Sequence, residues 1–203
     1  MRISKTTSKL IVLIAILVVL LGLSTTAFYV LYKGATRKTA EPVNTSSFVA
    51  PQQILVGLPM RLKIPSIRVD AMIDQLGLMT NGDMQAPAGP KTVGWYRFGP
   101  RPGAIGSAVV DGHYGIWENG ERSVFDELAK LKKGDEIYIE DDKGVVTTFV
   151  VRESRNFDPE ANTTDVFKSN DGLAHLNLIT CDGVWNTAAK SYDKRLVVFT
   201  DKQ

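Results

Sequence analysis

Short apolar runs rich in β-branched and aromatic residues recur from residue 53 to the C-terminus, and this pattern leaves few fold classes open. The runs end at turn residues such as Pro65, Gly112 or the Asn81-Gly82-Asp83 segment. The eight runs are Met60–Ile64, Ile67–Ile73, Val93–Tyr96, Ser107–Asp111, Glu136–Glu140, Val145–Arg152, Leu176–Thr180 and Arg195–Thr200. Eight or so strands in about 150 residues, with one or two short helices, predict a closed, all-β barrel.

One helix is predicted, from Val124 to Lys133. Ser123 could cap its start and Gly134 could end it. Acidic residues occupy the first turn, basic residues occupy the last turn, and the apolar residues Phe125, Leu128 and Leu131 form a stripe.

A charge-free apolar segment, residues 10–32, precedes this β-rich part and is flanked by Lys9 and Lys33. As a helix it would be about 35 Å long, enough to cross a hydrocarbon core of about 30 Å. A signal peptide cleaved near residues 25–27 is the alternative, but the apolar run continues past that point. The predicted organisation is a tail (1–9), a transmembrane anchor (10–32), an extended linker (33–52) and a folded domain (53–203).

The charge distribution bears on where the domain works. Residues 1–41 hold six of the 24 basic residues and one of the 22 acidic ones, so the remainder has three more acids than bases. A slightly acidic domain argues against nucleic-acid binding, whereas basic residues beside an apolar span are typical of membrane proteins. We expect a single-pass protein of the cell membrane, with the short N-terminal tail cytoplasmic and the folded domain extracellular.

Three polar residues are candidates for chemistry, because each borders an apolar run: His113, Cys181 and Arg195. A thiol nucleophile needs its thiolate form, which a nearby imidazolium or guanidinium favours. A histidine could also protonate a leaving amine, and an arginine could hold an oxyanion. Each residue also has an ordinary explanation: a buried cysteine, a turn histidine and a surface arginine. His175, the other histidine, is predicted to be structural or solvated.

At these residues the chain resembles the sortases, membrane-anchored cysteine transpeptidases of bacterial cell envelopes. The likeness runs from Arg61 to Phe199 and rests on Leu178-Ile179-Thr180-Cys181, on Gly112-His113, and on Arg195 within KRLVVF. Further stretches resemble the class F branch: KIPSIRVDAMIDQLGL, VGWYRFGPRPGAIGSAVVDGH, VFDELAKLKKGDE and SYDKRLVVF.

The resemblance implies an eight-stranded barrel with Cys181 as nucleophile, His113 as general acid/base and Arg195 as donor to an oxyanion or substrate carbonyl. It implies surface proteins with an LPxTG-like sorting signal, cleaved between Thr and Gly, as substrates. An amine on a peptidoglycan precursor or a pilin lysine would accept the acyl group. By the same resemblance, Thr180 and Trp185 are candidates to line the peptide groove. No cofactor and no metal is expected.

Departures from the family pattern qualify these expectations. Asn177 stands where the best-known classes often have threonine, so the groove floor could differ. Residues 33–59 lack the Asp-Pro-aromatic lid element of pilin-polymerising sortases, which favours anchoring over polymerisation. Asp141-Asp142 is interpreted as a hairpin tip rather than a calcium site. Two alternatives stay open: a peptidase that passes the acyl group to water, and an inactive anchored barrel that binds peptides.

Overall fold

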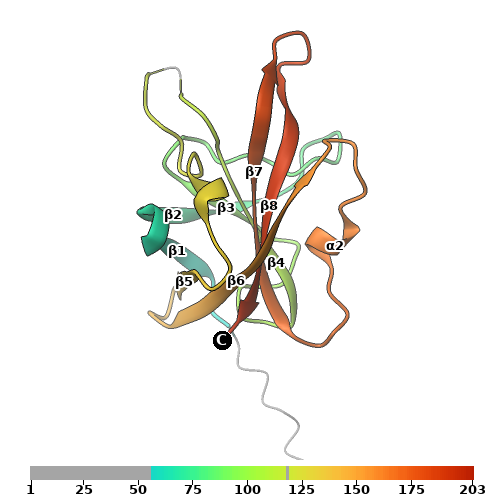
Figure 1. The fold of residues 1–203 in the computed structure, drawn as a ribbon. Helices are drawn as coiled ribbons and strands as arrows, with labels where there is room; N and C mark the ends of the chain where they lie inside the picture. The colour runs from blue at the N-terminus through green and yellow to red at the C-terminus, as the bar shows by residue number, and fades with distance from the viewer. Residues whose placement is uncertain (1–55, 118) are drawn as a thin grey trace, which may run out of the picture. The chain divides into compact units, whose positions relative to one another are not determined.

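The computed structural model describes residues 56–203 except residue 118, and eight strands in this part close into a barrel. In barrel order the strands are β1-β2-β3-β4-β7-β8-β6-β5, which confirms the predicted closed eight-stranded barrel (Figure 1). Their bounds are β1 Pro59–Ile64, β2 Val69–Leu76, β3 Val93–Tyr96, β4 Gly106–Gly112, β5 Glu136–Asp141, β6 Val146–Phe157, β7 Ala174–Asn186 and β8 Ser191–Lys202. The helical elements are η1 (Pro65–Ile67), η2 (Leu128–Lys130) and α2 (Thr164–Phe167).

The predicted anchor (10–32) and linker (33–52) lie outside the described residues. Within residues 56–203, residue 118 excepted, no helix has the length and apolarity needed to span a membrane.

Two neighbouring strand pairs are parallel, β2 with β3 and β4 with β7. Parallel pairing requires a crossover connection, and the chain between β4 and β7 contains β5, β6 and α2. The pairing also brings the C-terminal ends of β4 and β7 to the same end of the barrel (Figure 1).

Side chains alternate between the two faces of each strand, so the wall formed by β4, β7 and β8 is packed on both sides. The inner face fills the main core, with Ala108, Val110, Leu176, Leu178, Leu196 and Val198 among its members. The outer face carries a second cluster of Val109, Val197 and Phe199, which packs against Val166 of α2 and the half-buried Ile179. Along β7, Cys181 therefore belongs to the outer face and Thr180 to the inner one.

The predicted helix at Val124–Lys133 is wrong. Residues 124–127 form turns, and η2 supplies one short 3-10 segment. The buried residues Phe125, Leu128 and Leu131 recur every three positions, which matches the three residues per turn of a 3-10 helix. Leu131 is already extended, and the Ser123 hydroxyl has no hydrogen-bond partner among the described residues, so it caps nothing there.

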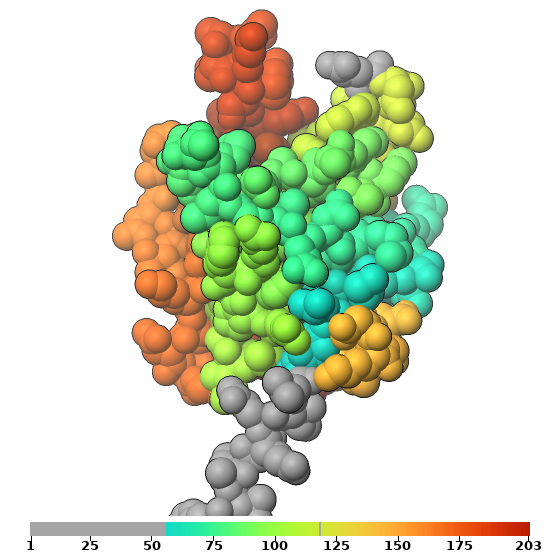
Figure 2. All heavy atoms as spheres, turned by 180° about the vertical axis from the view of Figure 1, so that it is seen from behind, coloured from blue at the N-terminus to red at the C-terminus, as the bar shows by residue number. Residues whose placement is uncertain are grey.

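Strands β7 and β8 run further than their apolar segments predict. The predicted strands end at Thr180 and begin at Arg195, but the hairpin continues to Asn186 and resumes at Ser191. This extension is mostly polar and exposed, so it has no apolar alternation to detect. It projects above the barrel, at the same end as the segment that follows β4 (Figure 2).

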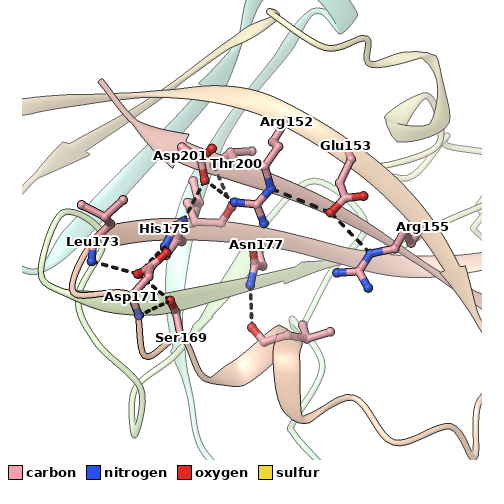
Figure 3. A network of polar contacts seen from close by, with 12 residues as sticks. Arg152, Glu153, Arg155, Ser169, Asp171, Leu173, His175, Asn177, Thr200 and Asp201 are labelled. Carbon is pink, nitrogen blue, oxygen red and sulfur yellow. Dashed lines mark hydrogen bonds and ion pairs between the residues drawn. The ribbon is translucent and has the colours of Figure 1, made fainter.

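At the opposite end of β7, the buried His175 is clamped between two aspartates (Figure 3). Its Nδ1 lies 2.8 Å from Asp201 Oδ1, and its Nε2 lies 2.9 Å from Asp171 Oδ2. Asp171 also accepts hydrogen bonds from the Leu173 N–H at 2.9 Å and the Ser169 hydroxyl at 2.7 Å. The network joins the loop before β7 to β8, which agrees with the structural role expected of His175.

We predict that Asp171→Asn weakens the domain and flattens the pH dependence of its stability in acid. The Leu173 N–H, the Ser169 hydroxyl and His175 hold the pKa of the Asp171 carboxyl well below its usual range. Its contribution to stability is therefore present above the unfolded-state pKa and is lost as the pH falls through the folded-state pKa. Urea unfolding at a series of pH values from about 6 to about 2 measures this. Asp165→Asn, which removes an exposed ion pair with Arg155, is the control and should change stability less. Equal acid sensitivity in Asp171→Asn and the wild type would contradict the prediction.

Candidate active site

Cys181 and Arg195 lie directly opposite each other on β7 and β8, as Cα partners of the antiparallel ladder. Neighbouring residues Thr180 and Leu196 point into the barrel, so alternation places Cys181 and Arg195 on the outer face. Both side chains are half-buried. The thiol and the guanidinium thus share one face, and both stand within strands rather than at the strand ends expected from the sequence.

His113 follows the last residue of β4, on the other side of β7. The parallel register pairs Asp111 with Ile179, and continuing it by two residues brings His113 level with Cys181. Cys181 in β7, Arg195 in β8 and His113 directly after β4 thus belong to three neighbouring segments of the barrel wall.

Local packing fixes the His113 ring. Its Nε2 lies 2.8 Å from the carbonyl oxygen of the buried Pro87, and the Trp117 ring meets it edge-on at 4.7 Å between centroids. A carbonyl can only accept, so Nε2 carries a hydrogen and Nδ1 is left to exchange a proton. Gly112 is required before it, since a Cβ there would stand 2.5 Å from the Phe125 ring.

The Arg195 guanidinium is held by its own hairpin. Nη1 donates to the carbonyl oxygens of Tyr192 at 3.0 Å and Lys194 at 2.9 Å, and Nη2 donates to the Ser191 hydroxyl at 3.1 Å. A guanidinium has five N–H donors. Among the described residues, the Nε–H and one Nη2–H have no acceptor, so they are available to an incoming carbonyl oxygen.

Thr180 is buried, and its hydroxyl donates to the carbonyl oxygen of Gly112 at 2.7 Å. The bond joins β7 to β4 on the inner side of the wall, one residue from Cys181 and one from His113. The resemblance predicts that Thr180 lines the peptide groove, but the structure places its side chain inside the barrel, where its hydrogen bond holds Gly112 next to His113.

We predict that Thr180→Val lowers the free energy of unfolding by about 1 kcal/mol, because it removes a buried hydrogen bond. It should also lower the rate of the reaction, since Gly112 positions His113. Thr200→Val is the matched control: the Thr200 hydroxyl is equally buried and donates to Leu176 O at 2.7 Å, joining β8 to β7 at a residue five positions before Cys181. Denaturant titration and peptide turnover measured on both variants should show similar destabilisation, but slower turnover only for Thr180→Val. Unchanged turnover in both would remove the positioning role.

Three aromatic rings connect the segment carrying His113 to the hairpin carrying Cys181. Tyr192 stands between Tyr114 and Trp185, edge-on to each at 5.2 Å between ring centroids. Gly115 lets the Tyr192 hydroxyl approach, because a Cβ there would stand 2.5 Å from that oxygen. Trp185, a predicted groove residue, is half exposed on the hairpin, where a ligand can reach it.

Burial raises the pKa of the Cys181 thiol, the guanidinium of Arg195 lowers it, and the carboxylate of Asp111 raises it further. The net direction is upward, opposite to the direction that activation by a neighbouring cation predicts. In this structure the thiol is therefore mostly protonated at neutral pH.

No group of three or more His, Cys, Asp or Glu residues within the described ranges is arranged to hold a metal ion. The Asp141 and Asp142 carboxylates instead accept backbone N–H groups. Asp141 accepts from Gly57, Lys143 and Val145, and Asp142 accepts from Leu58.

Comparison with known proteins identifies the family. The sortase domain model matches residues 62–203, which is more than two thirds of the chain. The chain belongs to the sortase family. No curated protein sequence gives a significant match.

Solved sortase structures share its fold. Sortase C-1 from Actinomyces oris is 27% identical with a TM-score of 0.56, covering 71% of this chain and 71% of that one. Sortase C2 of group B Streptococcus pilus island 1 is 25% identical with a TM-score of 0.56, covering 71% of this chain and 73% of that one. Sortase A from Corynebacterium diphtheriae, at 23% identity and a TM-score of 0.55 over 72% of this chain and 60% of that one, has the same fold. As a sortase, the protein is a cysteine transpeptidase.

The sequence alone does not predict the contacts of two further residues of this sortase, Asp111 and Asn177. Asp111 was counted only as a strand residue, although a carboxylate at the end of an apolar strand was the available signal. Asn177, noted only as a departure from the family pattern, donates from Nδ2 to Val166 O at 2.6 Å and holds α2 against the outer face. The contact joins β7 to the α2 segment of the β6–β7 connection, so a local sequence pattern does not predict it.

Proposed function

We propose that this sortase is a membrane-anchored transpeptidase that cleaves an LPxTG-like sorting signal between Thr and Gly and joins the protein to an amine of the cell envelope. The observation that carries the proposal is the pairing of Cys181 with Arg195 on the outer face, beside His113 at the end of the adjacent strand. Thiol, imidazole and guanidinium are the groups that acyl transfer through a thioester needs.

In the first half-reaction, Cys181 transfers its proton to Nδ1 of His113 as the sulfur attacks the threonine carbonyl carbon. The free N–H groups of Arg195 hold the carbonyl oxygen, which becomes an oxyanion in the tetrahedral intermediate. The C–N bond then breaks, and His113 gives its proton to the departing glycine amine. Burial opposes formation of the Cys181 thiolate in this step, and the Arg195 guanidinium favours it.

In the second half-reaction, the acceptor amine attacks the thioester carbon, its excess proton passes to His113, and the C–S bond breaks. An amine attacks a thioester readily, so the energy of the cleaved peptide bond is retained in the new amide. Water as acceptor would give hydrolysis instead. The two outcomes share one site and differ only in what reaches the thioester first.

The finer assignments belong to the same proposal. The stretches quoted from the sequence support the class F branch, and the missing lid element supports anchoring of surface proteins to a peptidoglycan precursor over polymerisation. The charge-free segment 10–32 supports a membrane anchor with the catalytic domain outside the cell. A pilin lysine is the alternative acceptor, and at least seven of the matched structures are sortases C.

The test is a ligation assay on the full chain in detergent. Wild type and Cys181→Ala are incubated with a panel of LPxTG-type peptides, with and without triglycine, and products are identified by mass spectrometry. Ligated product from the wild type alone supports transpeptidation, and the panel ranks the signals. Cleavage without ligation supports the peptidase alternative. No product from any peptide, with a Cys181 thiol that also resists alkylation, supports the inactive barrel.

A further inference from the structure

Asp111 places a carboxylate on the face that carries the reactive thiol. Its Cα is paired with Ile179 in β7 on one side and with Gly94 in β3 on the other. The residues before it alternate, with Val110 in the core and Val109 in the outer cluster, so Asp111 projects outward. On β7 the next outward residue after Ile179 is Cys181.

No cation in the described part of the chain makes contact with this carboxylate. Its hydrogen-bond donor is the Gly112 N–H. The Arg195 guanidinium and the His113 ring act on the carboxylate through space, but among the described residues neither forms a hydrogen bond or an ion pair with it: Arg195 bonds its own hairpin and Nε2 of His113 faces Pro87 O. The charged or titratable groups that act on Asp111 are therefore His113 from β4, Cys181 from β7 and Arg195 from β8, while β3 contributes Gly94.

The carboxylate works against the first half-reaction. Burial raises the pKa of Asp111 to about 6, so the group is still mostly ionised at neutral pH. The same charge raises the pKa of the Cys181 thiol and so disfavours the thiolate. Once the thioester has formed, the sulfur no longer titrates, and the carboxylate is left half-buried beside an acyl group that awaits an amine.

We propose that Asp111 binds the ammonium group of the acyl acceptor. An ammonium is compact, carries three donors and has the positive charge that no group in direct contact with the carboxylate supplies within the described residues. The inference rests on the proposed function, because it assigns a site to the second substrate of that reaction.

The proton balance is simple. The bound ammonium passes one proton to the Asp111 carboxylate, which later releases it to water. The neutral amine forms a bond to the thioester carbon, the C–S electrons return to sulfur, and the second proton leaves the nitrogen for His113. Acceptors that carry a cationic amine are thus concentrated beside the acyl-enzyme, whereas water gains nothing from the carboxylate.

Kinetics of Asp111→Asn on the full chain test this site. With an LPxTG-type peptide and triglycine at pH 7.5, the KM for triglycine should rise about tenfold, as expected for loss of a charge-assisted contact. Peptide cleavage without amine should become faster, because the charge that disfavours the Cys181 thiolate is removed. Hydroxylamine, which is largely uncharged at that pH, should show an unchanged KM. Asp182→Asn is the matched control, because Asp182 neighbours Cys181 but accepts a hydrogen bond from Asn156 Nδ2 at 3.0 Å.

A second readout needs no turnover. Iodoacetamide labelling of Cys181 against pH should shift to lower pH in Asp111→Asn, and triglycine should shift the wild-type profile the same way but leave that of Asp111→Asn unchanged. An unchanged KM for triglycine, an equal rise for hydroxylamine, or no effect of triglycine on wild-type labelling would overturn the proposal. Failure of the proposed function would appear separately, as absence of peptide cleavage by the wild type while the labelling shifts persist.

Discussion

Replacing Cys181 by serine is expected to lower the rate of sorting-peptide cleavage by at least about 10³-fold. A serine hydroxyl has nearly the shape of the thiol but a far higher pKa, and this site offers one histidine to activate it. Cys181 is half-buried on the outer face of β7, so serine should fit without disturbing the barrel.

The comparison is made on full-length wild type, Cys181→Ser and Cys181→Ala, with peptide cleavage followed by mass spectrometry and folding checked by thermal unfolding. Both variants should melt near the wild type and both should be inactive. Residual cleavage above a tenth of the wild-type rate in Cys181→Ala would mean that another group is the nucleophile.

Replacing Arg195 by alanine should reduce kcat by about 10²–10³-fold, the typical effect of removing one oxyanion donor. Arg195→Lys should recover little of the loss. The guanidinium is oriented by three bonds to its own hairpin and still offers two N–H groups, whereas an ammonium is a single point charge on a flexible stem.

Separate determination of kcat and KM distinguishes the possible roles of Arg195. A loss confined to kcat supports stabilisation of the oxyanion, while a loss confined to KM would indicate binding of the ground-state peptide. Lys130→Ala is the control, because Lys130 pairs with Glu127 on η2 outside the site. Near-normal turnover by Arg195→Lys would show that charge alone suffices.

The barrel could be predicted because each strand contains a short apolar run that is bounded by turn residues. Each of the eight apolar runs became a strand, with turn residues between them. The prediction of a helix at Val124–Lys133 was wrong because its buried apolar residues repeat every three positions. This spacing favours a 3-10 turn over an α-helix. The extension of β7 and β8 was not predicted because its residues are mostly polar and exposed, so they show no alternation of apolar and polar positions.

For the site, too, some features could be predicted from the sequence and others could not. Residue type and resemblance singled out Cys181, His113 and Arg195, and the barrel order explains why they meet: β4, β7 and β8 are neighbours although β5 and β6 separate them in sequence. The upward direction of the pKa of Cys181 depends on burial and on Asp111, which only the folded arrangement reveals.

The most direct test of this account is to look for the acyl-enzyme. The full-length protein is mixed with an LPxTG-type peptide without amine, its intact mass is recorded, and the modified residue is mapped after digestion. We expect an acyl adduct that corresponds to the peptide up to and including threonine, located on Cys181 and removed by hydroxylamine, which cleaves thioesters. Peptide cleavage without such an adduct at any time, or an adduct on another residue, would contradict it.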